Sequence, residues 1–169
     1  MMRKATQDRS VRVACPIPPD LLPAAAALWW AHFGMGPRRA RFRGDRGVVA
    51  VDEAGRVLGV AGLRDAGGGF APQGAGLLTP LFRAAPPTAD LVIDGIAVAR
   101  PRQGVGAQLL MAAMAQARAH ARPGLRAEVR AANGAARAFY AALGFEEEGR
   151  GRYGLPWWGQ VVILRRDAA

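Results

Sequence analysis

A strand, a glycine-containing turn and a helix follow one another between Leu91 and Met111. Residues 91–98 are mostly apolar and rich in β-branched side chains, and Gly104 and Gly106 open the helix. The first backbone N–H groups of a helix have no partner within it, and the helix dipole adds partial positive charge there. Glycine lets a phosphate oxygen approach these groups because it has no side chain. The sequence therefore predicts a phosphate or pyrophosphate site at the start of this helix.

Apolar periodicity and turn residues predict the elements that surround this turn. We expect strands at residues 11–14, 47–52, 57–64, 125–131, 145–148 and 159–165, and helices at 21–33, 106–121 and 134–143. Asp20 and Asn133 are the expected N-caps of the first and last helix. The glycine-rich stretch 66–76 is predicted to be a loop or a lid, and 77–82 a short helix or a strand. At least one of Trp29 and Trp30 is expected in the core.

The length and composition fit one soluble domain. The chain has 169 residues, of which 51% are hydrophobic and 21% charged, so we expect a single domain over 1–169 with a flexible tail at 1–10. No apolar run is long enough to span a membrane, and the first residues lack the apolar core of a signal peptide. Cys15 is the only cysteine, which excludes an internal disulfide. These observations predict a cytoplasmic protein without a membrane partner.

The net charge of +10 raises the question of nucleic acid binding. Lys4 is the only lysine, and the arginines are scattered along the chain rather than gathered into one basic segment. This distribution favours a general surface property and attraction for an anionic cofactor over a nucleic acid site.

A second segment, residues 133–145, follows the glycine turn one strand later. Its pattern N-x-x-A-x-x-F-Y-x-x-x-G-F, together with the G-x-G turn, resembles the GCN5-related N-acetyltransferase (GNAT) superfamily over residues 91–145. The resemblance implies an α/β (α+β) fold with a mixed central sheet of about six to seven strands flanked by helices. Its central strands are expected to splay apart and form the acyl-CoA cleft.

The resemblance implies acetyl-CoA, or another acyl-CoA, as the cofactor. Its pyrophosphate is expected on the glycine turn, and its pantetheine arm is expected to pair with the central strand, where Gly95 predicts a bulge. The expected cofactor-binding residues are Ile96, Ala97, Val98, Arg102, Gln103, Gly104, Val105, Gly106, Ala107, Asn133, Ala136 and Arg137. Pro101 departs from the family's glutamine or arginine and lacks an N–H group, so Arg100 or Arg102 is expected to supply charge instead. No metal site is expected.

Three residues are candidates for proton transfer. Tyr140 matches the family tyrosine that protonates the departing sulfur of coenzyme A, although Phe139 and Tyr140 could instead only pack the helix on the sheet. Glu128 opens a run similar to the E-V-R-x-x-N of ribosomal-protein N-terminal alanine acetyltransferases, in which the glutamate is the base. The alternative is a surface ladder in which Glu128 lies between two arginines, Arg126 and Arg130. Asp94, before Gly95, is the second candidate for the base.

The resemblance therefore predicts an N-acetyltransferase that acts by direct attack of an amine, with a tyrosine as general acid. The acceptor is expected to be a primary amine of a small molecule or of a protein N-terminus, and a homodimer is compatible with the family. The alternatives are a non-catalytic domain that binds coenzyme A and a basic module that binds nucleic acid. A dinucleotide oxidoreductase is disfavoured because Leu109 occupies the position of the third glycine in its fingerprint.

Overall fold

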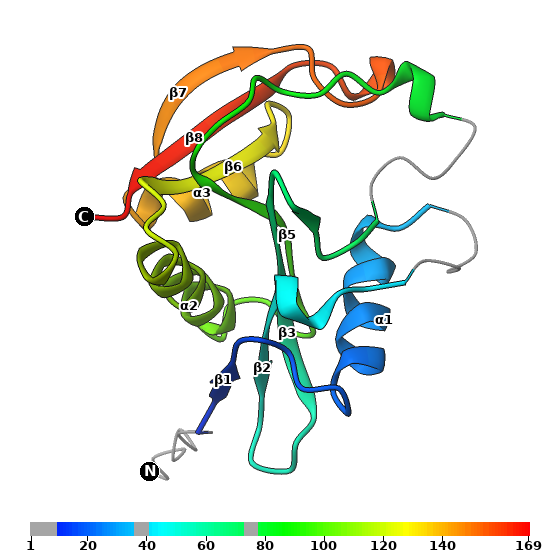
Figure 1. The fold of residues 1–169 in the computed structure, drawn as a ribbon, viewed down its shortest axis with the longest axis vertical. Helices are drawn as coiled ribbons and strands as arrows, with labels where there is room; N and C mark the ends of the chain where they lie inside the picture. The colour runs from blue at the N-terminus through cyan, green and yellow to red at the C-terminus, as the bar shows by residue number, and fades with distance from the viewer. Residues whose placement is uncertain (1–9, 36–40, 73–77) are drawn as a thin grey trace, which may run out of the picture.

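The computed structural model describes residues 10–35, 41–72 and 78–169 (Figure 1). The strands are β1 (Arg12–Ala14), β2 (Gly47–Val51), β3 (Val57–Asp65), β4 (Gly68–Gly69), β5 (Leu91–Val98), β6 (Gly124–Arg130), β7 (Glu146–Gly151) and β8 (Val161–Asp167). The helices are α1 (Leu22–Phe33), α2 (Val105–Ala119) and α3 (Gly134–Ala142), with 3-10 turns η1 (Gly44–Arg46), η2 (Thr79–Leu81) and η3 (Pro156–Trp158). No helix in these ranges combines the length and the hydrophobicity that a membrane span requires.

One sheet organises these elements. Its strand order is β1-β2-β3-β5-β6-β8-β7, and β4 pairs with β3 outside this order. The β5–β6 pair is parallel, whereas the other pairs are antiparallel. The predicted mixed sheet flanked by helices is confirmed, with the two-residue β4 as a strand that the sequence did not indicate.

The helices cover opposite faces of the sheet, with α1 on one side and α2 and α3 on the other (Figure 1). The α2 face buries one apolar stripe of the helix, which includes Leu109, Leu110 and Met114, as its periodicity predicts. These residues pack on inward-facing strand residues such as Ile93 and Ala127. A second cluster lies under α1, where Trp29 is buried among residues of β2, β3 and β5, so the predicted core tryptophan is confirmed.

The two central strands part in the middle of the sheet. β5 and β6 pair from Leu91 and Leu125 only as far as Ile93 and Ala127, although both strands continue beyond these residues. The predicted splaying of the central strands is therefore confirmed.

A β-bulge lies next to the point of divergence. The register between β3 and β5 shifts so that Asp94 and Gly95 stand opposite Gly62. Gly95 has φ +88°, in the left-handed region, and a Cβ atom there would lie 2.7 Å from the ring of Phe33. The predicted bulge at Gly95 is confirmed, and glycine is required both by the backbone conformation and by the close approach of α1.

The prediction of Asp20 as an N-cap is wrong. The cap residue of α1 is Leu21, and no side chain accepts a hydrogen bond there. The carbonyl oxygen of Pro18 accepts from the backbone N–H groups of Leu21 and Leu22 instead, so the turn that precedes the helix satisfies these donors.

The glycine-rich stretch is partly a strand. Gly68 and Gly69 pair with the end of β3, and Phe70 donates its N–H to Leu63 and is fully buried. Phe70 therefore anchors the first half of the predicted loop in the core. Within the next stretch, Thr79–Leu81 is a 3-10 turn, whereas residues 73–77 lie outside the described part of the chain, as do residues 1–9 of the predicted tail.

The predicted N-cap of α3 is confirmed and gives a stability test. The Asn133 Oδ1 atom accepts a hydrogen bond of 3.1 Å from the Ala136 N–H. Replacing Asn133 by Ala should lower the free energy of unfolding by about 1 kcal/mol, because one N–H of the first turn loses its partner. Denaturant unfolding measures this change. Asn133→Asp keeps the acceptor and should remain within a few tenths of a kcal/mol of the unmodified protein; equal losses in both variants would contradict the capping role.

Candidate active site

The glycine turn presents free backbone donors at the start of α2. Gly104 is the N-cap and has φ +75°, and Gln108 makes the first helical bond, to the Gly104 carbonyl at 3.2 Å. The preceding N–H groups, of residues 105–107, have no acceptor in the described part of the protein. A Cβ atom on Gly104 would meet nothing within 4 Å, so the space above the turn is open. This arrangement suits an anion such as a phosphate.

The two glycines of the turn serve different purposes. Gly104 supplies the left-handed backbone conformation. Gly106 instead allows close packing between helices, because a Cβ atom there would lie 3.3 Å from the ring of Phe139 on α3. The sequence assigned both glycines to phosphate approach, whereas the structure uses Gly106 to bring α3 against the first turn of α2.

A pocket of 200 Å³ borders this turn. It is lined by Asp52, Arg56, Val57, Leu58, Ala99, Arg100 and Gln103. The hairpin between β2 and β3 thus brings Arg56 beside Arg100, although Asp52 binds Arg56 at 2.7 Å. The sequence analysis pointed to Arg100 but missed Arg56, because only the tertiary structure places that hairpin next to the turn.

One edge of β5 is open beyond the divergence. Ile96, Ala97 and Val98 pair with β3 on one side, whereas the ladder to β6 has already ended at Ile93. The backbone groups that face β6 at these positions are therefore available to a ligand that pairs like an additional strand.

Two carboxylates lie at the mouth of the divergence. Asp94 follows Ile93, the last residue of β5 that pairs with β6, and Glu128 follows Ala127, the last residue of β6 that pairs with β5. Arg64 reaches across from β3, with Nη2 3.4 Å from Glu128 Oε2 and Nε 3.8 Å from Asp94 Oδ1. Each of these three side chains is about one quarter exposed. The structure therefore brings both predicted base candidates together with an arginine that the sequence did not single out.

Burial and neighbouring charges act on this cluster. Burial raises the pKa of Asp94, and the nearby negative charge of Glu128 raises it further, whereas the Arg64 guanidinium lowers it. The Trp29 indole N–H donates to the backbone carbonyl of Asp94 at 2.8 Å, which ties α1 to this point of β5.

The predicted surface ladder of Arg126, Glu128 and Arg130 is only partly correct. Arg126 is 2% exposed, donates through Nη1 to the Pro86 carbonyl at 2.7 Å, and places Nη2 3.1 Å from Glu128 Oε1. Arg130 is exposed and pairs with none of the described carboxylates. Glu128 therefore belongs to a half-buried network rather than to a row of solvated charges.

Tyr140 lies on the other face of the sheet. It is 7% exposed and packs edge-on against Phe139 and Phe145 in the cluster under α2 and α3. Burial raises the pKa of its phenol above the ordinary value. The Tyr140 ring therefore packs α3 on the sheet, as the alternative to the acid role expects. Its hydroxyl makes no hydrogen bond to a described residue.

The remaining predicted cofactor residues lie at the start of α3 and in the turn. Asn133 and Ala136 are joined by the capping bond, and Arg137 points Nη1 toward the Ala131 carbonyl at 3.5 Å. Arg102 and Gln103 are exposed in the turn, and Arg102 has φ +61°. At Gly106 the first turn of α2 lies against both Val98 of β5 and Phe139 of α3.

Comparisons with known proteins agree with this geometry. The family model described as Acetyltransferase (GNAT) family matches residues 15–145. No curated protein sequence matches the chain. The ribosomal-protein-S18-alanine N-acetyltransferase from Escherichia coli is 18% identical with a TM-score of 0.60, and the match covers 95% of each chain. An IAA acetyltransferase from Bacillus cereus is 18% identical with a TM-score of 0.62, covering 94% of this chain and 99% of that one.

A protein from Bacillus anthracis whose crystal structure holds acetyl coenzyme A is 17% identical with a TM-score of 0.51, covering 72% of this chain and 61% of that one. At these identities the structural likeness shows the fold. The family match also agrees with the predicted cofactor, since GNAT acetyltransferases use acetyl-CoA, and it overrules the oxidoreductase alternative. The chain belongs to the GNAT acetyltransferase family.

Proposed function

We propose that this protein transfers an acetyl group from acetyl-CoA to a primary amine of a small molecule or of a protein N-terminus. The observation that carries the proposal is the parting of β5 and β6 between two groups suited to proton transfer. Asp94 and Glu128 lie at the mouth on the α1 side, and Tyr140 lies under the helices of the opposite face. The attack of an amine on a thioester is assisted by a proton acceptor for the amine and a proton donor for the leaving thiolate.

The residues present fit acetyl-CoA. The free N–H groups after Gly104 suit its pyrophosphate, Arg56 and Arg100 lie beside them, and the open edge of β5 at 96–98 suits the amides of its pantetheine arm. When bound, acetyl-CoA supplies the acetyl group and a thiolate leaving group. Asn133, Ala136 and Arg137 complete the proposed binding surface from the start of α3.

We assign the proton acceptor to Glu128. An alkyl ammonium must lose a proton before it can act as a nucleophile, and a fixed carboxylate can accept that proton directly or through one water molecule. Arg64 and Arg126 hold the Glu128 carboxylate from two sides. Asp94 is the second candidate, since burial raises its pKa and so makes it a stronger base than an exposed aspartate.

We assign the proton donor to Tyr140. A phenol has an ordinary pKa near 10 and burial raises the pKa of Tyr140, so the hydroxyl is protonated at neutral pH. It can therefore donate a proton but does not compete with Glu128 for one.

Acetyl-CoA should stabilise the folded protein, whereas NAD should not. A ligand at a hundredfold excess over its Kd adds about 2.7 kcal/mol to the free energy of unfolding, which thermal unfolding detects as a higher Tm. Gly104→Asp places a negative charge on the turn, and Gly104→Asn is its neutral match. Both side chains tolerate the positive φ at this position, and a Cβ atom there meets nothing within 4 Å. The Tm increase should survive in Gly104→Asn and shrink in Gly104→Asp. Equal increases in both variants would remove the turn from the binding site.

Tyr140→Phe should reduce kcat by roughly 10²–10⁴-fold, because the ring is kept and the acidic proton is lost. The Tm and the stabilisation by acetyl-CoA should stay unchanged, since the packing against Phe139 and Phe145 does not involve the hydroxyl. Steady-state acetylation of a primary amine measures kcat. Tyr153→Phe, at the other tyrosine of the chain, is the control. An unchanged kcat in Tyr140→Phe would exclude the tyrosine as the acid and favour a domain that only binds coenzyme A.

Glu128→Gln should lower kcat/KM by about 100-fold or more near neutral pH, where most of the amine is protonated. Raising the pH should restore part of the rate, because a growing fraction of the amine is then neutral without a base. Asp94→Asn, measured over the same pH range, should cause a smaller loss. If Asp94→Asn costs more than Glu128→Gln, the base is Asp94 and Glu128 serves to hold Arg64.

A further inference from the structure

Three buried N–H groups near the proposed acceptor side make no hydrogen bond of good geometry, although Arg126 Nη2 lies 3.1 Å from Glu128 Oε1 and Arg64 Nε lies 3.8 Å from Asp94 Oδ1. They are Arg64 Nε, Arg126 Nε and Arg126 Nη2, and no other buried side-chain polar atom in the described ranges is left without a hydrogen bond. An unsatisfied buried donor costs about 1–3 kcal/mol, so native proteins rarely gather such groups in one place without a purpose. The guanidinium groups beside Asp94 and Glu128 are therefore incompletely satisfied by the protein.

Arg64 differs from the other ion-paired arginines of the described residues in having no ion pair shorter than 3.4 Å. Its contacts to Glu128 and Asp94 measure 3.4 and 3.8 Å. By contrast, Arg46 lies 2.6 Å from Asp65 and Arg56 lies 2.7 Å from Asp52, which are ordinary lengths for a charge-assisted hydrogen bond. Arg64 is therefore positioned by the two carboxylates without being saturated by them.

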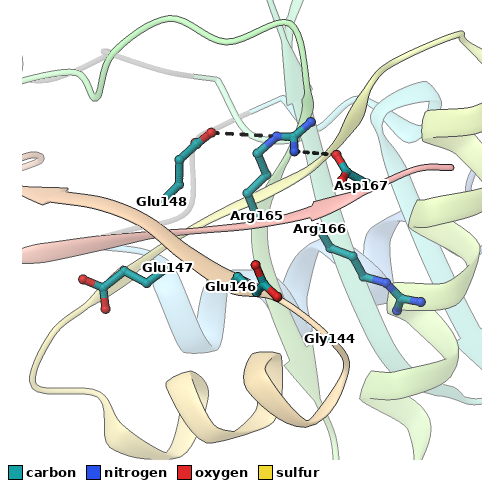
Figure 2. Close-up of a pocket in the computed structure, with 7 residues that line it drawn as sticks. All are labelled: Gly144, Glu146, Glu147, Glu148, Arg165, Arg166 and Asp167. Atoms are coloured by element: carbon teal, nitrogen blue, oxygen red, sulfur yellow. Dashed lines mark hydrogen bonds and ion pairs between the residues drawn. The ribbon is translucent and has the colours of Figure 1, made fainter.

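The pocket in Figure 2 shows a cluster of similar composition whose guanidinium groups are engaged. It has a volume of 480 Å³ and is lined by Gly144, Glu146, Glu147, Glu148, Arg165, Arg166 and Asp167. Arg165 bonds Asp90 and Asp167 at 2.8 and 2.6 Å, and Arg166 donates to the Leu143 carbonyl at 2.8 Å. The Arg165 guanidinium is thus engaged by carboxylates at short distances, whereas that of Arg64 is not.

We propose that Arg64 binds a carboxylate of the acceptor and that the acceptor is therefore a free amino acid. The inference rests on the proposed acetyltransferase function and names its substrate class. Arg64 is one quarter exposed, and its Nη1 atom makes no hydrogen bond within the described structure. In an α-amino acid the carboxylate is one carbon away from the amine, so the group that holds it must adjoin the proton acceptor. Arg64 meets this condition because it contacts both Asp94 and Glu128.

The charge balance of the cluster matches a zwitterion. Two carboxylates and two guanidinium groups face the opening, so an ammonium group and a carboxylate each find an opposite charge. Arg126 is a positioning residue here, because it is buried and holds Glu128 while donating to Pro86. The net charge of +10 also attracts acceptors that carry a carboxylate in preference to polyamines.

The test compares the proteinogenic amino acids with their α-amides, which keep the amine and the side chain but lack the carboxylate. Two readouts are taken: the Tm without acetyl-CoA, and kcat/KM for acetylation with acetyl-CoA. At least one amino acid should raise the Tm and be acetylated, with kcat/KM about tenfold or more above that of its amide, equivalent to about 1.4 kcal/mol. Arg64→Gln should abolish this preference by lowering kcat/KM for the acid more than for the amide.

Arg122→Gln is the matched control, since Arg122 also pairs with a carboxylate of β3, Asp65, at 2.8 Å but lies outside the cluster. It should keep the preference. Arg64→Lys, which retains the charge without the planar fork, replaces Arg64→Gln if the latter fails to fold, and should leave an intermediate preference.

Amides or peptides that are acetylated as well as the acids would overturn the proposal and point to a protein N-terminus. A preference that persists in Arg64→Gln would also overturn it, as would an absence of any amino acid substrate in a protein that acetyl-CoA stabilises. If acetyl-CoA causes no Tm increase, the proposed acetyltransferase function fails separately. The Tm increase caused by amino acids, which requires no acetyl-CoA, then decides whether Arg64 binds a carboxylate.

Discussion

The β-bulge at Asp94 and Gly95, in the ladder between β3 and β5, lies directly after the residue at which the ladder between β5 and β6 ends. The extra residue re-aims β5 after Asp94, and β6 follows its own direction from Glu128 onward. Trp29 holds the Asp94 carbonyl, and Phe33 lies against Gly95, so α1 packs on the bulge itself. The start of the open edge of β5 and the position of Asp94 coincide with this local irregularity.

The sheet separates two chemical environments at the opening. On the α2 and α3 face, apolar packing surrounds Tyr140 and keeps its phenol protonated. On the α1 face, Arg64 and Arg126 surround the carboxylates of Asp94 and Glu128. A phenol that shared a pocket with these carboxylates would donate a hydrogen bond to one of them. On opposite faces of the sheet, Tyr140 and the carboxylates make no such bond.

The arginine content of the chain has a structural use at this site. A guanidinium group offers five donors in a planar fork, so Arg64 can contact two carboxylates and still retain unoccupied N–H groups. The same property accounts for the contrast with Arg165, whose donors are taken up by Asp90 and Asp167. The difference between a structural arginine and one available to a ligand lies in how many of its donors the protein satisfies.

The sequence by itself determined the elements whose signals are local. Apolar periodicity specified α2, the Asn133 side chain specified the start of α3, and the glycine turn with the 133–145 pattern indicated the family, because each depends on residues a few positions apart. Asp20 failed as a cap since a backbone carbonyl took its place, and β4 was missed because glycines carry no strand signal. Only the tertiary structure decided that Arg64 on β3, Asp94 on β5 and Glu128 on β6 meet. That meeting depends on strand register, on the bulge and on the angle between β5 and β6, which arise from packing between segments distant in the chain.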